Sequence, residues 1–124
     1  MNPAELFSHE TNPVRLAPGD ILFKAGETGD AMFVVLEGAL EVLVGETVVE
    51  RAPRGAILGE MALIDQSPRS ATVVAREAAT LVRLDSARFQ RLVQQHPFFA
   101  THVMKVLADR IRAKDRSLPQ DRSA

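Results

Sequence analysis

The glycines of this 124-residue chain are confined to its first half. All seven lie at or before Gly59, and the segments between them are short and rich in β-branched residues. Turn signals at such close spacing are typical of antiparallel strands joined by tight loops, rather than of strands alternating with long helices. The front of the chain is therefore predicted to form a sandwich, a jelly roll or a barrel.

The predicted strands are bounded by glycine, proline and acidic turn residues. Alternation of apolar and polar residues is clearest from Leu40 to Val44. We expect strands over residues 14–17, 21–25, 31–37, 39–44, 47–52, 71–75 and 79–84. The fold class that this favours is α+β, with an antiparallel β-roll or jelly roll of about eight strands followed by helices.

The spacing of apolar residues becomes helical after residue 84. Asp85 or Ser86 is the expected N-cap of a helix that ends before Pro97, and a second helix is expected from about residue 98. The apolar face of the second helix is predicted to comprise Phe99, Val103, Val106, Leu107 and Ile111, with Arg110 at its edge. The chain is thus divided into an N-terminal segment (1–10), one domain (11–116) and a flexible tail (117–124).

The charges and the amino terminus restrict the partners that we expect. Lys and Arg number 15 against 16 Asp and Glu, whereas nucleic-acid binding needs a basic face, so no direct nucleic-acid partner is expected. The sequence has neither a signal-peptide pattern nor an apolar run of membrane-spanning length. We therefore expect a cytoplasmic protein without a membrane partner.

Residues that could carry catalysis are few. The chain has no cysteine, and His9, His96 and His102 lie outside the predicted strands, so we expect them at the surface. A metal-dependent barrel enzyme needs ligands that converge from strands. Neither a G-x-S-x-G elbow nor a Walker or Rossmann glycine pattern is present. A binding module without catalytic residues, metal or cofactor is favoured over a small β-barrel enzyme.

The segment GEMALIDQSPRSATVVA, residues 59–75, combines a short helical turn with a proline and a strand. Gly59 permits a tight turn, and the unpaired N–H groups of the helical turn can face an anion. The helical turn is expected over residues 60–64 and is ended by residues 65–68, since the residue before Pro68 avoids the helical conformation, and Arg69 follows. A guanidinium binds two phosphate oxygens at once.

Glu60 does not suit a phosphate, but a carboxylate can accept hydrogen bonds from hydroxyl groups such as those of a ribose. Taken singly, Glu60 and Arg69 would more often form a surface ion pair that contributes about 0–1 kcal/mol. Taken together in this segment, they indicate a sugar phosphate of low net charge as the ligand.

The pattern G-E-M-A-L followed by P-R-S-A-T-V-V-A resembles the phosphate-binding cassette of the cyclic nucleotide-binding domain family. This family includes catabolite activator proteins, cyclic-nucleotide-gated channels and regulatory subunits of cAMP-dependent protein kinase. The resemblance extends to LAPGDILFKAGETGDAMFVVLEGALEVL, which is similar to the first strands of the family, and to FQRLVQQHPFFATHVMKVLADRIR, which is similar to its closing helices.

The resemblance implies a role for each residue of the cassette. Glu60 would accept from the ribose 2′-hydroxyl, Arg69 would pair with the cyclic phosphate, and Gly59 would let the backbone approach the sugar. Further donors to the phosphate would come from Ser70 and Ala71, while Met61 and Ala62 belong to the same binding segment. The implied ligand is cAMP, with cGMP as the alternative, because Ser70 could donate to either ligand.

In the family, a residue of the last helix closes over the purine. Arg110 is the candidate here because a guanidinium can stack on a base, with Lys114 and Arg116 as alternatives and a solvated Arg110 as the opposing interpretation. The ligand is expected to draw the cassette inwards, so that Leu63 repacks against the helix carrying Phe89 and the last helix swings over the pocket.

The implied function is a regulatory module that binds a cyclic nucleotide and signals by conformational change to a downstream protein that the sequence does not identify. A monomer or weak homodimer is expected. The chain stops soon after Arg116, without the helix-turn-helix of catabolite activators, and Met1 favours a stand-alone sensor over a domain of a larger protein. The alternative keeps the fold but makes it a protein-interaction domain or a sensor of another small effector.

Overall fold

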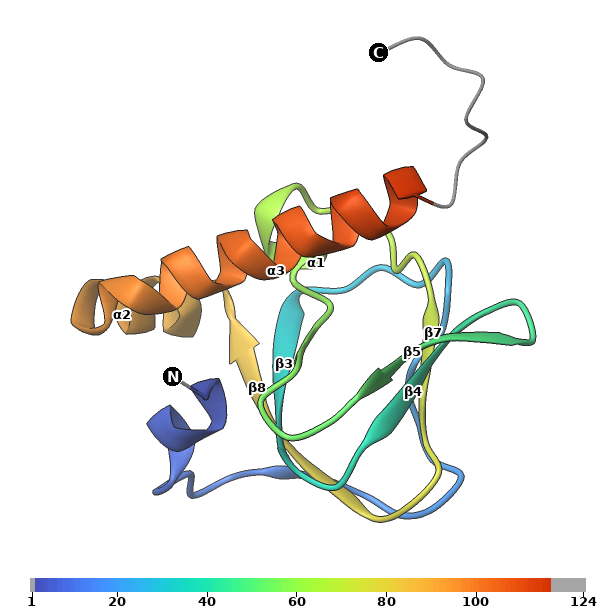
Figure 1. Ribbon diagram of the computed structural model, residues 1–124. Helices are drawn as coiled ribbons and strands as arrows, with labels where there is room; N and C mark the ends of the chain where they lie inside the picture. The colour runs from blue at the N-terminus through green and yellow to red at the C-terminus, as the bar shows by residue number, and fades with distance from the viewer. Residues whose placement is uncertain (1, 117–124) are drawn as a thin grey trace, which may run out of the picture.

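The chain folds into two antiparallel sheets of four strands each, with helices across one end of the strands, as the computed structural model shows (Figure 1). The structure describes residues 2–116, the last three of them by their backbone alone. The elements in chain order are η1 Pro3–Phe7, β1 Val14–Leu16, β2 Ile21–Phe23, β3 Ala31–Glu37, β4 Leu40–Val44, β5 Thr47–Ala52, β6 Ile57–Leu58, α1 Met61–Ile64, β7 Thr72–Ala75, β8 Ala79–Asp85, α2 Ser86–Gln95 and α3 Pro97–Arg116.

The sheets have the strand orders β1-β8-β3-β6 and β2-β7-β4-β5. Each predicted strand is present, with ends that differ by at most two residues, and the α+β β-roll is confirmed. The additional strand is β6, in which Leu58 pairs with Phe33 of β3. Two residues are too few for an alternating pattern, so the sequence does not reveal this strand.

Strand β3 contributes to two separate apolar cores, because successive side chains of a strand point to opposite faces. Phe33 and Val35 pack between the sheets, whereas Met32 and Val34 pack against the helices. Burial on both faces explains why Ala31 to Val35 is a continuous apolar run. The strand therefore links the two cores.

The second core is covered by α2, α3 and η1. Of the two expected caps, Asp85 caps α2, accepting a hydrogen bond from the Arg88 backbone N–H at 2.8 Å. Helix α3 begins at Pro97, one residue before its predicted start, and buries Phe99 completely. Phe7 of η1 joins the same core, so the N-terminal segment packs onto the domain. The predicted tail 117–124 lies outside the described residues.

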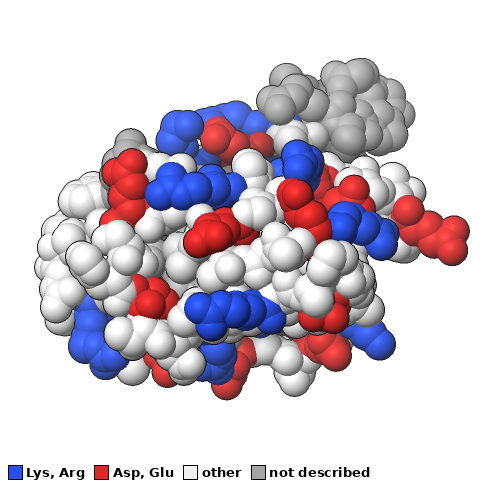
Figure 2. Space-filling view, turned by 90° about the horizontal axis from the view of Figure 1, so that it is seen from below, with Lys and Arg blue, Asp and Glu red and all other residues white. Residues whose placement is uncertain are grey.

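Charged side chains of both signs are interspersed over the face seen from below (Figure 2). Two ion pairs join the β7–β8 turn to the neighbouring strands, Arg76 with Glu41 of β4 at 2.8 Å and Glu77 with Arg51 of β5 at 3.3 Å. This face thus differs from the basic stripes that bind nucleic-acid backbones. Among the helices of the described chain, none has the length and hydropathy to cross a membrane.

Candidate functional site

Gly59 makes the turn from β6 into the short helix α1. Its φ of 75° lies in the left-handed region, which favours glycine. A Cβ added here would overlap the guanidinium of Arg69, so the position also needs the absence of a side chain. Gly29 is pressed against the same guanidinium, although its φ is not positive. Two glycines therefore make room for one buried cation.

The guanidinium of Arg69 is buried, with 9% of the residue exposed. Its Nη1 donates to the Gly59 carbonyl at 2.9 Å, and its Nη2 donates to the Ala31 carbonyl at 2.8 Å. The Cζ atom lies 4.2 Å from the centroid of the Phe23 ring, which is a cation–π contact. Backbone dipoles and an aromatic face thus surround the charge.

None of the carboxylates in the described part of the chain forms an ion pair with Arg69. Burial lowers the pKa of Arg69, and the more distant charges of Asp30, Glu27 and Glu60 oppose that shift only in part. The two hydrogen bonds use two of the five N–H donors of a guanidinium. An anion bound here would supply both the missing negative charge and the missing acceptors.

Glu60 lies at the start of α1 and is also buried, with 3% of the residue exposed. Its Oε1 accepts a hydrogen bond from Nη1 of Arg110 on α3. Glu60 and Arg110, which were predicted from the sequence as separate site residues, are therefore in direct contact. A buried carboxylate needs such a partner, because an unpaired charge in this position would be strongly destabilising.

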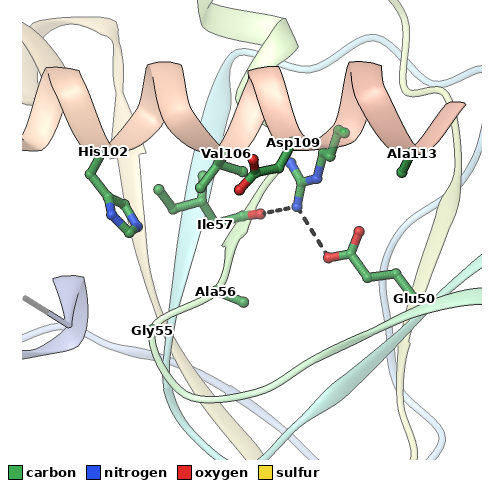
Figure 3. Close-up of a pocket in the computed structure, with 9 residues that line it drawn as sticks. Glu50, Gly55, Ala56, Ile57, His102, Val106, Asp109 and Ala113 are labelled. Carbon is green, nitrogen blue, oxygen red and sulfur yellow. Dashed lines mark hydrogen bonds and ion pairs between the residues drawn. The ribbon is translucent and has the colours of Figure 1, made fainter. Parts of the chain in front are cut away.

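Arg110 is shared among three acceptors. Besides Glu60, its Nη2 donates to the Ile57 carbonyl at 2.7 Å and to Oε2 of Glu50 at 3.2 Å (Figure 3). Burial alone would lower the pKa of Arg110, but the attraction of Glu60 and Glu50 raises it above its ordinary value. The interpretation of Arg110 as a freely solvated helix residue is therefore wrong. Lys114 and Arg116, the alternatives, lie outside the described side chains.

The other residues of the cassette differ in exposure. Ala62 is buried and Met61 is exposed on α1, whereas Ser70 is exposed and Ala71 half-buried on the segment that leads into β7. Leu63, on the inner side of α1, packs against the apolar core that Phe89 and Leu92 also contact. The structure thus brings Gly59, Glu60, Arg69 and Arg110 into one connected set of contacts, with the remaining residues beside it in the chain.

Several residues of this site were not predicted. Phe23 lies under Arg69, and Glu50 and the Ile57 carbonyl hold Arg110. The predicted strand over residues 47–52 includes Glu50 but gave no partner for it, because that partner lies 60 residues away in the chain. Gly29 was identified only as a turn residue, and its contact with Arg69 depends on the folded structure.

A groove of about 340 Å³ lies beneath α3, beside the predicted site rather than within it (Figure 3). Its lining residues are Glu50, Gly55, Ala56, Ile57, His102, Val106, Asp109, Arg110 and Ala113. Arg110 is the one predicted site residue among them. His102 was expected at the surface, but it is half-buried in this groove, where burial and nearby positive charge lower its pKa. In the part of the chain described, no group of three or more His, Cys, Asp or Glu could hold a metal ion.

Comparisons of sequence and of structure both relate this chain to proteins concerned with cyclic nucleotides. Residues 13–96 match the cyclic nucleotide-binding domain family. A cyclic nucleotide-gated potassium channel of Mesorhizobium japonicum is 44% identical over 92 residues, which cover 74% of this chain and 25% of the channel. The chain thus spans a quarter of the length of that relative.

Two solved structures have the same fold over most of the chain. One, from work on a cyclic-GMP-dependent signalling pathway that regulates bacterial phytopathogenesis, has a TM-score of 0.75 at 29% identity and covers 91% of this chain and 95% of its own. The other, PKAR CBD2 bound to Sp-2Cl-cAMPS, has a TM-score of 0.71 at 26% identity, with 89% of this chain and 74% of the other covered.

Proposed function

This chain belongs to the cyclic nucleotide-binding domain family, and on that premise we propose that it binds cAMP as a regulatory ligand between Arg69 and Glu60. The observation that carries the proposal is the buried guanidinium of Arg69, which has unused donors and no ion-pair partner among the described residues. A cyclic phosphate carries a single negative charge, so it neutralises this cation without adding a second charge.

Glu60 provides the second half of the site. Its buried carboxylate accepts the hydrogen bond of the ribose 2′-hydroxyl, and Gly59 lies between Glu60 and the guanidinium of Arg69. The exposed Ser70 and the backbone of Ala71 donate to the phosphate from the start of β7. The separation of a cation for the phosphate from a carboxylate for the sugar matches the two chemically different parts of the ligand.

We assign cAMP rather than cGMP on the likeness to PKAR CBD2, which was solved with a cAMP analogue. The other structural relative comes from a cyclic-GMP-dependent pathway, so cGMP is the competing ligand. Ser70 can donate to the phosphate of either nucleotide. The choice between the two purines therefore needs a direct comparison of their affinities.

The ligand signals by changing the contact between the cassette and α3. Glu60 belongs to the cassette and is bonded to α3 through Arg110, so a ligand that engages Glu60 also alters the helix contact. Leu63 transmits the movement of α1 to the core under α2 and α3. Greater affinity for one arrangement of these helices shifts the equilibrium towards it, and a downstream protein reads the result.

Titration calorimetry with cAMP and cGMP on the wild type and on Arg69→Ala tests this function. Loss of one partner from a buried charged contact should weaken binding by about 2–5 kcal/mol, roughly 30-fold or more. Arg51→Ala is the matched control, because Arg51 is an arginine of the same domain with 68% of its side chain exposed. Undiminished binding by Arg69→Ala would exclude the phosphate role, and a wild type that binds neither nucleotide would favour a protein-interaction domain or another effector.

A further inference from the structure

Arg110 bridges two carboxylates that come from different parts of the domain. Glu60 belongs to the cassette, and Glu50 belongs to β5, at the edge of the second sheet. Figure 3 shows the Glu50 carboxylate and the Ile57 carbonyl turned towards the same guanidinium beneath α3. The Arg110 side chain thus links α3 to β5 of the second sheet as well as to the cassette.

The proposed ligand competes with this arrangement. The inference rests on the proposed function, in which the ribose 2′-hydroxyl donates to Glu60. The Oε1 atom of Glu60 already accepts from Arg110, and only 3% of the residue is exposed. A ribose hydroxyl that binds the Oε1 atom would therefore take over part of the interaction that now joins Glu60 to α3.

Glu50 lies where it can retain Arg110 during that exchange. Its Oε2 is 3.2 Å from Nη2, the guanidinium nitrogen that does not contact Glu60, and 37% of its side chain is exposed. The Ile57 carbonyl accepts from the same nitrogen at 2.7 Å. Release of Nη1 by Glu60 thus leaves two acceptors in place on Nη2.

We propose that Glu50 is a positioning residue that keeps Arg110, and with it α3, on the domain when the ribose occupies Glu60. In the free protein, the guanidinium is divided between both carboxylates. In the bound protein, it rests on Glu50 and the Ile57 carbonyl, and Glu60 turns to the ligand. The charge of Arg110 remains compensated throughout, so the exchange does not leave a buried cation unpaired.

In this proposal, Glu60 holds Arg110 mainly in the free protein, and Glu50 holds it mainly in the ligand-bound protein. Loss of Glu50 should have little effect on the free protein, because Glu60 still holds Arg110. It should have a larger effect on the bound protein, because Glu60 is then engaged by the ligand. The side chains of the Arg110–Glu50 ion pair are about one-third exposed, so water weakens the pair. We therefore expect loss of Glu50 to raise the rate of ligand dissociation by only about three- to tenfold.

Stopped-flow dissociation of a fluorescent cAMP analogue from Glu50→Gln tests the proposal. The expected result is release about three- to tenfold faster than from the wild type. Glu46→Gln is the matched control, because Glu46 is an exposed carboxylate on the same β4–β5 hairpin and loses the same charge. Equal dissociation rates for Glu50→Gln and Glu46→Gln would overturn the role of Glu50.

Hydrogen exchange of the α3 backbone over residues 106–112 provides a second readout that a general loss of stability would not reproduce. Glu50→Gln should lose more protection in the cAMP-bound state than in the free state. Equal losses in the two states would contradict the exchange. In the Arg110→Ala background, Glu50→Gln should no longer alter dissociation, and a persistent effect would show that Glu50 acts independently of Arg110.

The two proposals fail in different ways. A wild-type chain that binds no cyclic nucleotide rejects the proposed function, and the exchange falls with it. A wild type that binds, together with a Glu50→Gln variant that releases the analogue at the control rate, rejects only the role of Glu50.

Discussion

Arg69 and Arg110 contact two adjacent residues of the cassette, Gly59 and Glu60, and they differ in what compensates their charge. Arg69 contacts carbonyls and an aromatic ring, and burial lowers its pKa. Burial alone would also lower the pKa of Arg110, but Glu60 and Glu50 raise it instead. The protein itself thus neutralises Arg110, whereas Arg69 is the cation with capacity left for an external anion.

The largest expected effect is the difference between these arginines in cAMP affinity. Arg69→Ala should lose about 2–5 kcal/mol of binding free energy, because it removes the partner of the phosphate. Arg110→Ala should lose about 0.5–1 kcal/mol if the guanidinium contributes only by stacking on the base. Calorimetry on both variants measures the difference, and equal losses would abolish the distinction between the two sites.

Ligand-induced stabilisation should separate the same two variants. Ligand at about 100 times its dissociation constant adds about 2.7 kcal/mol to the free energy of unfolding. A thermal melt should show this gain for the wild type and for Arg110→Ala, when each protein is given cAMP at about 100 times its own dissociation constant. Arg69→Ala at the wild-type concentration should show little of it. A full gain in Arg69→Ala would place the phosphate elsewhere.

Gly29 allows the packing around Arg69 to be tested without altering the arginine. A Cβ at Gly29 overlaps the guanidinium, so Gly29→Ala should destabilise the fold by about 1–3 kcal/mol, as overpacking does. In the Arg69→Ala background, the same substitution should be nearly neutral, because the overlapping group is gone. Urea unfolding of the four proteins measures the coupling, and a cost that persists without Arg69 would refute this account of Gly29.

Arg88 is a third arginine, with a single carboxylate partner, and it gives the smallest effect. It pairs with Glu10 at 2.8 Å. Burial alone would raise the pKa of Glu10, but hydrogen bonds from Arg88 and the backbone lower it from the ordinary 4.5. A lowered folded-state pKa stabilises the fold above pH 4.5, and this stabilisation is lost as the pH falls through the folded-state value.

Glu10→Gln should remove that part of the acid sensitivity. Urea unfolding between about pH 6 and pH 3 should give a shallower loss of stability for Glu10→Gln than for the wild type. Glu5→Gln, an exposed carboxylate of the same N-terminal segment, is the control. Parallel curves for Glu10→Gln and the wild type would show that the pair does not contribute.

The strands and the cassette could be predicted because their determinants are local. Alternation from Leu40 to Val44 identifies β4, and Pro68 separates the helical turn of α1 from Arg69 and β7. The partners of those side chains could not be predicted in the same way. The contact of Glu50 with Arg110, and the contact of Phe23 with Arg69, each join distant parts of the chain, and they depend on the relative placement of sheet and helix.

Strand β3 has a consequence for how the domain opens. Its side chains enter both apolar cores, and the carbonyl of its first residue, Ala31, accepts a hydrogen bond from Arg69. The two cores therefore cannot separate while β3 remains ordered, and we expect the domain to melt in a single cooperative transition. A ligand fixed to Arg69 would then slow the exchange of the β3 amides along with the opening of both cores.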